Sequence, residues 1–326
     1  MTSGELDAAG IADPRLRAAY ARCRSLNAQH GRTYFLATRL LAPEQRPAVH
    51  ALYGFARYVD DVVDMPAPNA TIDDIGRRID DAEEHMTAGR RRGTSDHPVI
   101  AAVVDTAHRY HIADELFTAF FDSMRMDLSI RDYPSRTDLA KYVYGSARVV
   151  GLQMLPVLGA VDDIQDAAPP AAALGEAFQL TNFLRDVGED LHRDRVYLPA
   201  DELAAFNVDR ERLTWCRDRG RADAPVRRAL AEQVAITRAV YREAAPGIAM
   251  LRPVSRPCIG TAFTLYAEIL DRIQEMDYNV FAARPVVGNA RRVRVAIPAF
   301  LAAMRHRRSL GRGSPDEQSA GKDPTR

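Results

Sequence analysis

Residues 49–64 read VHALYGFARYVDDVVD, and this stretch combines a regular apolar pattern with three acidic side chains. Its apolar residues recur every three or four positions, at Val49, Leu52, Ala56, Val59 and Val63. This spacing predicts an amphipathic α-helix with one buried face. Steps of four, three and four residues align four polar side chains on another face, namely Tyr53, Arg57, Asp60 and Asp64. We therefore expect a helix that presents two carboxylates one turn apart.

A second stretch, QLTNFLRDVGED over residues 179–190, repeats this arrangement. Steps of three, four and four residues align Gln179, Asn182, Asp186 and Asp190 on one face. The opposite face of the predicted helix is apolar and consists of Leu180, Phe183, Leu184, Val187 and Leu191. The chain thus contains two predicted helices whose polar faces carry stacked oxygen-bearing side chains.

Helical spacing of apolar residues runs through most of the chain, and no segment alternates apolar and polar residues as a half-buried strand would. We therefore expect an all-α fold. Clusters of Pro, Gly, Ser and Asp predict loops between helices at residues 65–69, 93–98, 133–135 and 168–170. No repeat of fixed period is present, so we expect residues 15–300 to form a single helical domain.

The two ends of the chain differ in composition from the predicted domain. We expect residues 1–14 to be flexible and residues 301–326 to form a disordered basic and polar tail, because they hold few apolar groups. Residues 291–308 mix arginines with apolar side chains. This mixture suggests the hypothesis of a peripheral contact with an anionic membrane.

The overall composition is that of a globular protein with a balanced charge. The 44 Lys and Arg residues equal the 44 Asp and Glu residues, so nothing indicates nucleic acid as a partner. The three cysteines are too few and too widely spaced for a disulfide framework or a zinc site. The N-terminus lacks a signal-peptide pattern, and no apolar run reaches about 18 residues, so we expect a cytoplasmic location, with membrane association as the open alternative.

The chemistry of the two acidic faces favours a metal ion and a diphosphate. Like charges one turn apart destabilise a helix by roughly 0.2–0.5 kcal/mol, which a bound cation would relieve. Mg²⁺ prefers carboxylate and amide oxygens together with phosphate oxygens of a substrate. Arg57 and Arg185 lie beside the acids in the sequence and are suited to bind a diphosphate. The alternative is a non-catalytic helical scaffold whose acidic faces meet only solvent.

With these motifs, the chain resembles the phytoene/squalene synthase family over about residues 15–297. The first acidic motif follows YFLATRLLAPEQR at 34–46, and the second precedes RDRVYLP at 193–199. Between them, YVYGSARVVGLQMLP at 142–156 is similar to the family's helix along the prenyl channel. YAEILDRIQEMDYNVF at 266–281 is similar to its last helix. The motifs are most similar to those of the bacterial phytoene synthases in this family.

The resemblance implies a helical bundle of the isoprenoid synthase type with a central prenyl cavity. Magnesium ligands are implied at Asp60, Asp64, Asn182, Asp186 and Asp190. Substrate contacts are implied at His30, Gly31, Arg32, Thr33, Tyr53, Arg57, Tyr142, Gln179, Arg185 and Tyr266. The implied catalytic set is Tyr53, Arg57, Asp60, Asp64, Asp186, Asp190 and Tyr266.

The implied reaction joins two geranylgeranyl diphosphate molecules head to head, through a cyclopropyl (prephytoene) diphosphate, to phytoene. This is the first committed step of carotenoid biosynthesis. Mg²⁺ is the implied cofactor, and Mn²⁺ can substitute for it. The nearest alternative is squalene or dehydrosqualene synthesis from two farnesyl diphosphates, with NADPH required only for squalene. A chain-elongating synthase or terpene cyclase is a further alternative, although DVGED at 186–190 departs from the DDxxD motif of elongating enzymes.

Two positions depart from the usual pattern of the family. Thr33-Tyr34 stands where serine and phenylalanine are common, which preserves a hydroxyl and an aromatic ring. Arg148 stands where glycine is common beside the prenyl channel. A buried Arg148 side chain would narrow the channel and change the length of prenyl chain that fits, unless it points outward or toward the diphosphate.

Overall fold

The computed structural model describes residues 3–310, and the regular structure within that range is helical. Two isolated bridges join Asp132 to Val196 and Ala160 to Leu251, without forming strands. The helices are α1 (Ser3–Ala8), α2 (Pro14–His30), α3 (Arg32–Thr38), α4 (Arg46–Asp64), α5 (Ile72–Arg92), α6 (Ile100–Arg109), α7 (Asp114–Ser129), α8 (Arg136–Val143), the π-helical turn η1 (Tyr144–Arg148), α9 (Val149–Leu158), α10 (Ile164–His192), α11 (Ala200–Ala204), α12 (Arg210–Asp218), α13 (Ala224–Met250), α14 (Arg256–Glu275) and α15 (Asn289–Leu310). The predicted all-α fold is confirmed.

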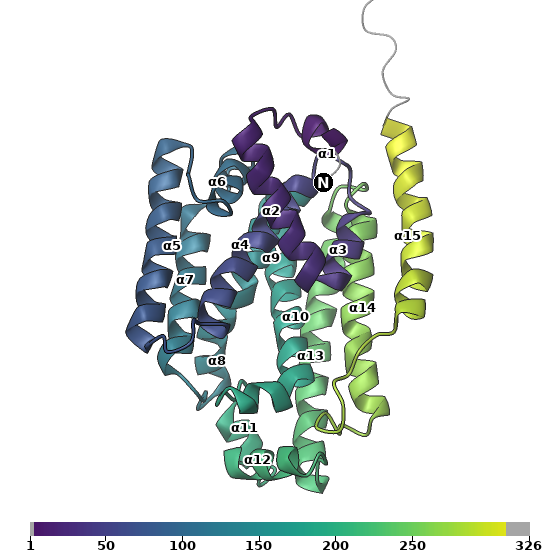
Figure 1. Ribbon diagram of the computed structural model, residues 1–326. Helices are drawn as coiled ribbons and strands as arrows, with labels where there is room; N and C mark the ends of the chain where they lie inside the picture. The colour runs from purple at the N-terminus through teal and green to yellow at the C-terminus, as the bar shows by residue number, and fades with distance from the viewer. Residues whose placement is uncertain (1–2, 311–326) are drawn as a thin grey trace, which may run out of the picture.

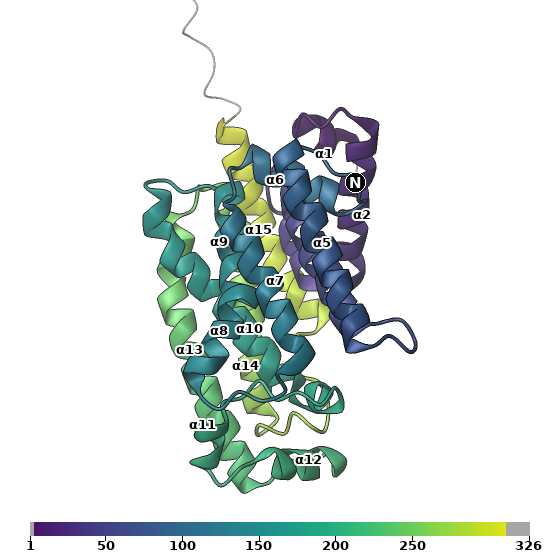
Figure 2. The same ribbon diagram turned by 90° about the vertical axis from the view of Figure 1, so that its left-hand side faces the viewer.

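The long helices run alongside one another as a bundle (Figures 1 and 2). α10 packs against α9, α13 and α14, whereas α4 packs against α2, α6 and α7. The short helices α11 and α12 lie at one end of the bundle, and α15 runs along the outside beside α14 (Figure 1). The two helices with acidic faces, α4 and α10, therefore belong to different parts of the bundle.

Helix α10 extends further than the sequence predicts. It begins after the N-cap Asp163, whose side chain accepts a hydrogen bond from the Gln165 N–H at 2.9 Å. The loop predicted at 168–170 is wrong, because α10 continues through Pro169 and Pro170. Packing compensates for the backbone hydrogen bonds lost at the prolines. Pro170 lies so close to Gly247 of α13 that a Cβ atom at Gly247 would be 2.8 Å from the Pro170 Cβ. The other three predicted loops are confirmed.

The N-terminal segment that was predicted to be flexible contains a short helix. α1 covers Ser3–Ala8, and the side chains of Leu6 and Ile11 are only 5% and 2% exposed. Arg17 further fixes this segment by donating a hydrogen bond to the Ile11 carbonyl oxygen at 2.8 Å. A few buried apolar side chains thus order a segment whose average composition is polar.

At the other end, α15 includes residues 301–310 of the predicted disordered tail. Its Ala303 is fully buried, which ties this part of the helix to the bundle. The remaining residues of the predicted tail, 311–326, lie outside the described range.

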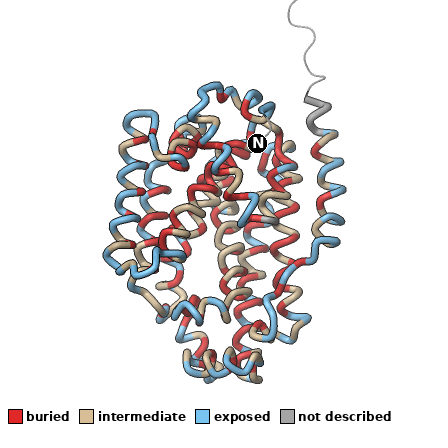
Figure 3. The backbone as a smooth tube through the Cα atoms, viewed as in Figure 1, coloured by how far each residue is buried: buried red, intermediate tan, exposed pale blue. Residues whose placement is uncertain are grey.

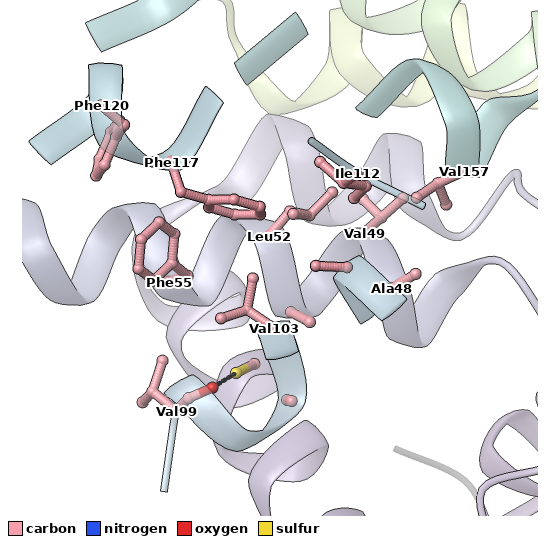
Figure 4. Close-up of a cluster of buried hydrophobic side chains, with 14 of the residues drawn as sticks. Ala48, Val49, Leu52, Phe55, Val99, Val103, Ile112, Phe117, Phe120 and Val157 are labelled. Atoms are coloured by element: carbon pink, nitrogen blue, oxygen red, sulfur yellow. Dashed lines mark hydrogen bonds between the residues drawn. The ribbon is translucent and has the colours of Figure 1, made fainter. Parts of the chain in front are cut away.

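An apolar core between α4, α6 and α7 holds α4 in place (Figure 4). The ring of Phe55 packs against Phe117 and Phe120, with ring centroids 5.7 and 5.5 Å apart. The Cys23 thiol donates to the Val99 carbonyl oxygen, with 3.8 Å between sulfur and oxygen. Burial of large apolar side chains contributes roughly 1.5–3 kcal/mol each. It also fixes the direction in which the polar face of α4 points.

Two glycines allow the backbones of η1, α9 and α10 to approach closely. A Cβ atom at Gly175 would lie 2.2 Å from the carbonyl oxygen of Ala147. A Cβ atom at Gly151 would lie 2.2 Å from the carbonyl oxygen of Ala171. Because each contact is with backbone, the helices would have to move apart to accommodate it. Glycine at these positions is therefore required by packing.

We predict that Gly175→Ala lowers the free energy of unfolding by about 1–3 kcal/mol, because its Cβ would push α10 away from η1. The matched control is Gly260→Ala on α14, where an added Cβ meets no atom within 4 Å. This control should be neutral or slightly stabilising, since alanine favours helix more than glycine. Urea denaturation of both variants measures the difference, and equal effects would contradict the packing account.

Candidate active site

Two adjoining cavities lie within the bundle. One has a volume of about 780 Å³ and a mainly polar wall, and the other has a volume of about 270 Å³ and a mainly apolar wall. Four side chains line both cavities and form what we call the neck: Tyr34, Tyr53, Gln179 and Asn182. The predicted site residues that line the polar cavity are His30, Gly31, Thr33, Tyr53, Arg57, Asp60, Asp64, Tyr142, Gln179, Asn182, Arg185, Asp186, Asp190 and Tyr266. The fold thus brings together residues from α2, α3, α4, α8, α10 and α14.

The acidic face of α4 is held by three arginines. Arg57 forms an ion pair with Asp60 at 3.3 Å and another with Asp61. Asp64 accepts hydrogen bonds from Arg193 and Arg195, each at 2.8 Å. Arg193 and Arg195 follow the end of α10, so these bonds connect the segment after one acidic helix to the end of the other. Both arginines belong to the motif at 193–199, but the sequence did not identify them as site residues.

The acidic face of α10 is held in a similar way. Arg185 binds the neighbouring Asp186 through two hydrogen bonds of 2.8 and 2.6 Å. Arg284, which follows α14, binds the same carboxylate at 2.8 and 3.0 Å. Burial acts to raise the pKa of Asp186, but the two arginines outweigh it and lower the pKa. Arg284 was not predicted from the sequence because it is 98 residues away from its partner.

Asp60 and Asp190 are in a different electrostatic situation. Burial and the neighbouring Asp64 raise the pKa of Asp60 to about 7. Burial and the neighbouring Asp186 raise the pKa of Asp190 to about 8. No ion pair with Asp190 is present among the side chains that the structure describes. Burial therefore disfavours the charge of both carboxylates, and a bound cation would favour their ionised form.

The residues of this cavity fit a divalent metal ion that is shared with a diphosphate. The Oδ1 atom of Asn182 is buried in the neck without a hydrogen-bond partner in the described chain, so it is free to act as an oxygen ligand. No group of three His, Cys, Asp or Glu side chains within that part of the chain is arranged as a complete metal site. Mg²⁺ does not need one, because it commonly binds one or two carboxylates and takes other ligands from substrate phosphates and water.

Of the substrate contacts implied at residues 30–33, His30, Gly31 and Thr33 line the polar cavity. His30 ends α2 and is exposed, and Thr33 is in the first turn of α3. Arg32 begins α3, but its side chain lies outside the described structure. Gly31 contacts the neck directly, since a Cβ atom there would be 2.7 Å from Tyr53 Cζ. A larger residue would displace the Tyr53 ring.

Aromatic rings cluster where the two cavities meet. The ring of Tyr34 lies 5.9 Å from Tyr53, 5.9 Å from Phe178 and 5.0 Å from Tyr266, measured between centroids. Burial raises the pKa of Tyr34 and of Tyr53 well above the ordinary value. Both phenols therefore stay protonated, and their ring faces are available to stabilise a positive charge. The sequence marked Tyr34 as a departure from the family pattern and not as a site residue.

Tyr142 lines the polar cavity and is part of a buried hydrogen-bond network. Its hydroxyl donates to one carboxylate oxygen of Asp127 at 2.8 Å, and the hydroxyl of Tyr197 donates to the other at 2.7 Å. Arg195 lies beside Asp127, with its Nε atom 4.0 Å from the carboxylate, and also binds Asp64. Asp127 is 5% exposed and thus links a predicted substrate contact to a predicted metal ligand. Asp127 belongs to no recognisable motif in the sequence of α7, so its role in this network was not predicted.

The apolar cavity extends from the neck between η1, α9, α10, α13 and α14. Its wall includes Ala147, Val150 and Met154, in agreement with the channel helix expected at 142–156. Arg148 does not line this cavity. Its guanidinium forms an ion pair with Glu176 at 3.4 Å, and its side chain is 42% exposed. Of the alternatives that the sequence left open, the outward position is the one found: Ala147 lines the cavity, and Arg148 lies outside it in the π-helical turn.

An all-helical bundle with a charged cavity that joins an apolar cavity has the isoprenoid synthase architecture. A crystal structure of a dehydrosqualene synthase in complex with a ligand shares this fold, with a TM-score of 0.78. The likeness covers 90% of this chain and 98% of the dehydrosqualene synthase, at 24% sequence identity.

The family model for squalene/phytoene synthase matches residues 27–295. The chain is 36% identical over 279 residues to the chloroplastic phytoene synthase 2 of Zea mays, covering 84% of this chain and 67% of that protein. It is also 36% identical over 279 residues to the phytoene synthase of Arthrospira platensis, covering 82% and 88% respectively. The chain therefore belongs to the squalene/phytoene synthase family of prenyltransferases, as the motifs in its sequence indicated.

We predict that Asp190→Asn stabilises the metal-free protein at about pH 8 more than at about pH 5. The folded state holds a proton on Asp190 up to about pH 8, whereas the unfolded state releases it near 3.8, the ordinary pKa of an aspartate. The wild type therefore loses stability as the pH rises through that window, and the amide removes this loss. We expect a difference on the order of 1 kcal/mol, reduced by partial solvent exposure.

Thermal unfolding in the presence of a chelator measures this effect. The exposed Asp162 supplies the matched control as Asp162→Asn, which should leave the pH dependence of the wild type unchanged. If Asp190→Asn shows the same pH dependence as the wild type, the buried carboxylate is not the source of the pH effect.

Proposed function

We propose that this enzyme joins two geranylgeranyl diphosphate molecules head to head to form phytoene, through prephytoene diphosphate. The observation that supports this best is the pair of cavities. One is lined by the carboxylates and arginines that a metal-bound diphosphate requires, and it adjoins, at the aromatic neck, an apolar cavity suited to prenyl chains. Relatives that carry the name phytoene synthase favour the C20 substrate over the C15 substrate. The proposed location is the cytoplasm, with no nucleic-acid partner.

The first step needs positive charge around the departing diphosphate. Arg57, Arg185 and Arg284 line the polar cavity and can turn from their carboxylate partners to diphosphate oxygens. Asp60, Asp64, Asn182, Asp186 and Asp190 would hold Mg²⁺, or Mn²⁺ in its place, which supplies the charge that weakens the carbon–oxygen bond. The diphosphate leaves with the electron pair of that bond, and an allylic cation remains.

The allylic cation then forms beside the neck, where aromatic rings replace water. The rings of Tyr34, Tyr53 and Phe178 line this region, and Tyr266 packs against Phe178 with centroids 4.5 Å apart. Ring faces attract a cation without forming a bond to it. Because the hydroxyls of Tyr34 and Tyr53 stay protonated, they do not trap the cation as phenolates.

Two carbon–carbon bonding steps complete the reaction. The double bond of the second substrate attacks the cation, and loss of one proton closes the cyclopropane ring. Departure of the second diphosphate, rearrangement and loss of a second proton then give the central double bond of phytoene. No electrons are gained or lost overall, so this route needs no NADPH. We assign the released protons to the departing diphosphates, since the neck tyrosines are poor bases.

We predict that purified protein with Mg²⁺ converts geranylgeranyl diphosphate to a C40 hydrocarbon without NADPH. Extraction and mass spectrometry identify the product, and parallel reactions contain farnesyl diphosphate, with and without NADPH. A chelator should abolish the product, and added Mg²⁺ or Mn²⁺ should restore it. A C30 product from farnesyl diphosphate alone would replace the proposal with dehydrosqualene synthesis, and an NADPH-dependent C30 product would replace it with squalene synthesis.

We predict that Asp60→Asn and Asp186→Asn each lower the rate of product formation about a hundredfold or more, because each removes charge from the proposed metal sites. Asp60→Asn should not lower the melting temperature, since burial and the neighbouring carboxylates already disfavour the charge of Asp60. The matched control is again Asp162→Asn, which should keep the wild-type rate. Unchanged rates in both cavity variants would support the non-catalytic scaffold instead.

A further inference from the structure

Helix α15 carries an apolar stripe on its outer face. Val293, Ile297, Phe300 and Leu301 are 53%, 55%, 46% and 48% exposed, although their side chains are large and apolar. They follow one another at steps of four, three and one residues, which places them on one side of a helix. Figure 1 shows α15 along the outer edge of the bundle, and Figure 3 shows how much of it is exposed.

The stripe is separate from the face through which α15 packs onto the bundle. α15 contacts α14 and α3, and its small residues Ala296 and Ala303 are 8% and 0% exposed. Arg291 forms an ion pair with Glu268 of α14, which fixes the first turn of the helix. Helix α15 continues through Pro298. Packing among residues 3–310 therefore accounts for one face of α15 and leaves the apolar stripe uncovered.

The charged side chains of α15 are all positive. Its sequence, Asn289–Leu310, contains six arginines and no aspartate or glutamate. Arg294 and Arg305 are exposed, and their positions on the helix border the apolar stripe. A basic helix with an exposed apolar stripe complements an anionic surface with an apolar interior. It does not complement a second copy of itself, because that would bring two sets of arginines together.

The start of α15 also reaches the polar cavity. Val286, Val287 and Arg292 line that cavity, and Val286 is 59% exposed. The exposed apolar surface thus begins at the cavity rim and continues along α15. A surface at this position would bring the cavity close to whatever the helix binds.

We propose that the outer face of α15 binds the surface of an anionic lipid bilayer. In the bound state, α15 lies in the plane of the interface, with Ile297 and Phe300 between the lipid headgroups and Arg294 and Arg305 at the phosphates. The contact is peripheral, since no helix within residues 3–310 has the length and apolar character needed to cross a membrane. The inference goes beyond the proposed reaction and is tested without substrate.

Co-sedimentation of the full-length protein with vesicles tests this proposal. The wild type should bind vesicles that contain phosphatidylglycerol and bind vesicles of pure phosphatidylcholine much more weakly. The double variant Ile297→Glu, Phe300→Glu should lose about tenfold or more in affinity, because two charges would enter the apolar layer. The double variant Arg294→Gln, Arg305→Gln should lose roughly fivefold for each arginine, and only for the anionic vesicles.

A matched control places the same change elsewhere on the surface. Ile72 and Val161 are 57% and 54% exposed, so Ile72→Glu, Val161→Glu introduces equal charge at equally exposed apolar positions. This variant should bind vesicles nearly as well as the wild type. Circular dichroism and thermal unfolding check that each variant is folded.

Three outcomes would overturn the proposal. In the first, the wild type stays in solution with both kinds of vesicle, which would show that α15 has no affinity for lipid. In the second, the α15 variant and its control lose binding equally, which would make the effect one of net charge alone. In the third, the wild type is a dimer and the Ile297→Glu, Phe300→Glu variant is a monomer, which would show that a second copy covers the stripe.

Discussion

The carboxylates that line the polar cavity repel one another, and the structure of this cavity depends on the interactions that offset the repulsion. Asp64 and Asp186 are each bound by two arginines, so their charge is balanced by direct contacts. Asp190 lacks such a partner among the described residues, and burial together with the neighbouring Asp186 raises its pKa. The fold tolerates this because apolar packing far from the cavity fixes the helices.

Helical spacing explains why the two acidic faces could be predicted from the sequence. Residues three and four positions apart share a face whatever the rest of the fold does, so the alignment of Asp60 with Asp64 follows from local geometry alone. The family motifs then supplied what spacing cannot, namely that two helices far apart in the chain line the same cavity.

Contacts that depend on the three-dimensional arrangement were not predictable in this way. Asp127 and Arg284 join the polar cavity from elements whose local sequence carries no pattern. The sequence left open whether Arg148 narrows the channel or points outward, and only the fold shows that it lies outside the cavity. The prolines of α10 were expected to lie in a loop between helices, but the helix continues through them and packs against α13. That error arose where packing overrides local propensity.

The two cavities that meet at the neck would interact differently with the substrate and with the product. A prenyl diphosphate has a charged end that the arginines and carboxylates can hold, and an apolar end that fits beyond the neck. The hydrocarbon product has no charged end, so nothing in the polar cavity attracts it and water beyond that cavity opposes its exit. Under the proposed reaction, departure of the hydrocarbon is therefore opposed by the same hydrophobic effect that favours substrate binding. A turnover number measured in buffer without lipid or detergent would then reflect the rate of product release more than the rate of carbon–carbon bond formation.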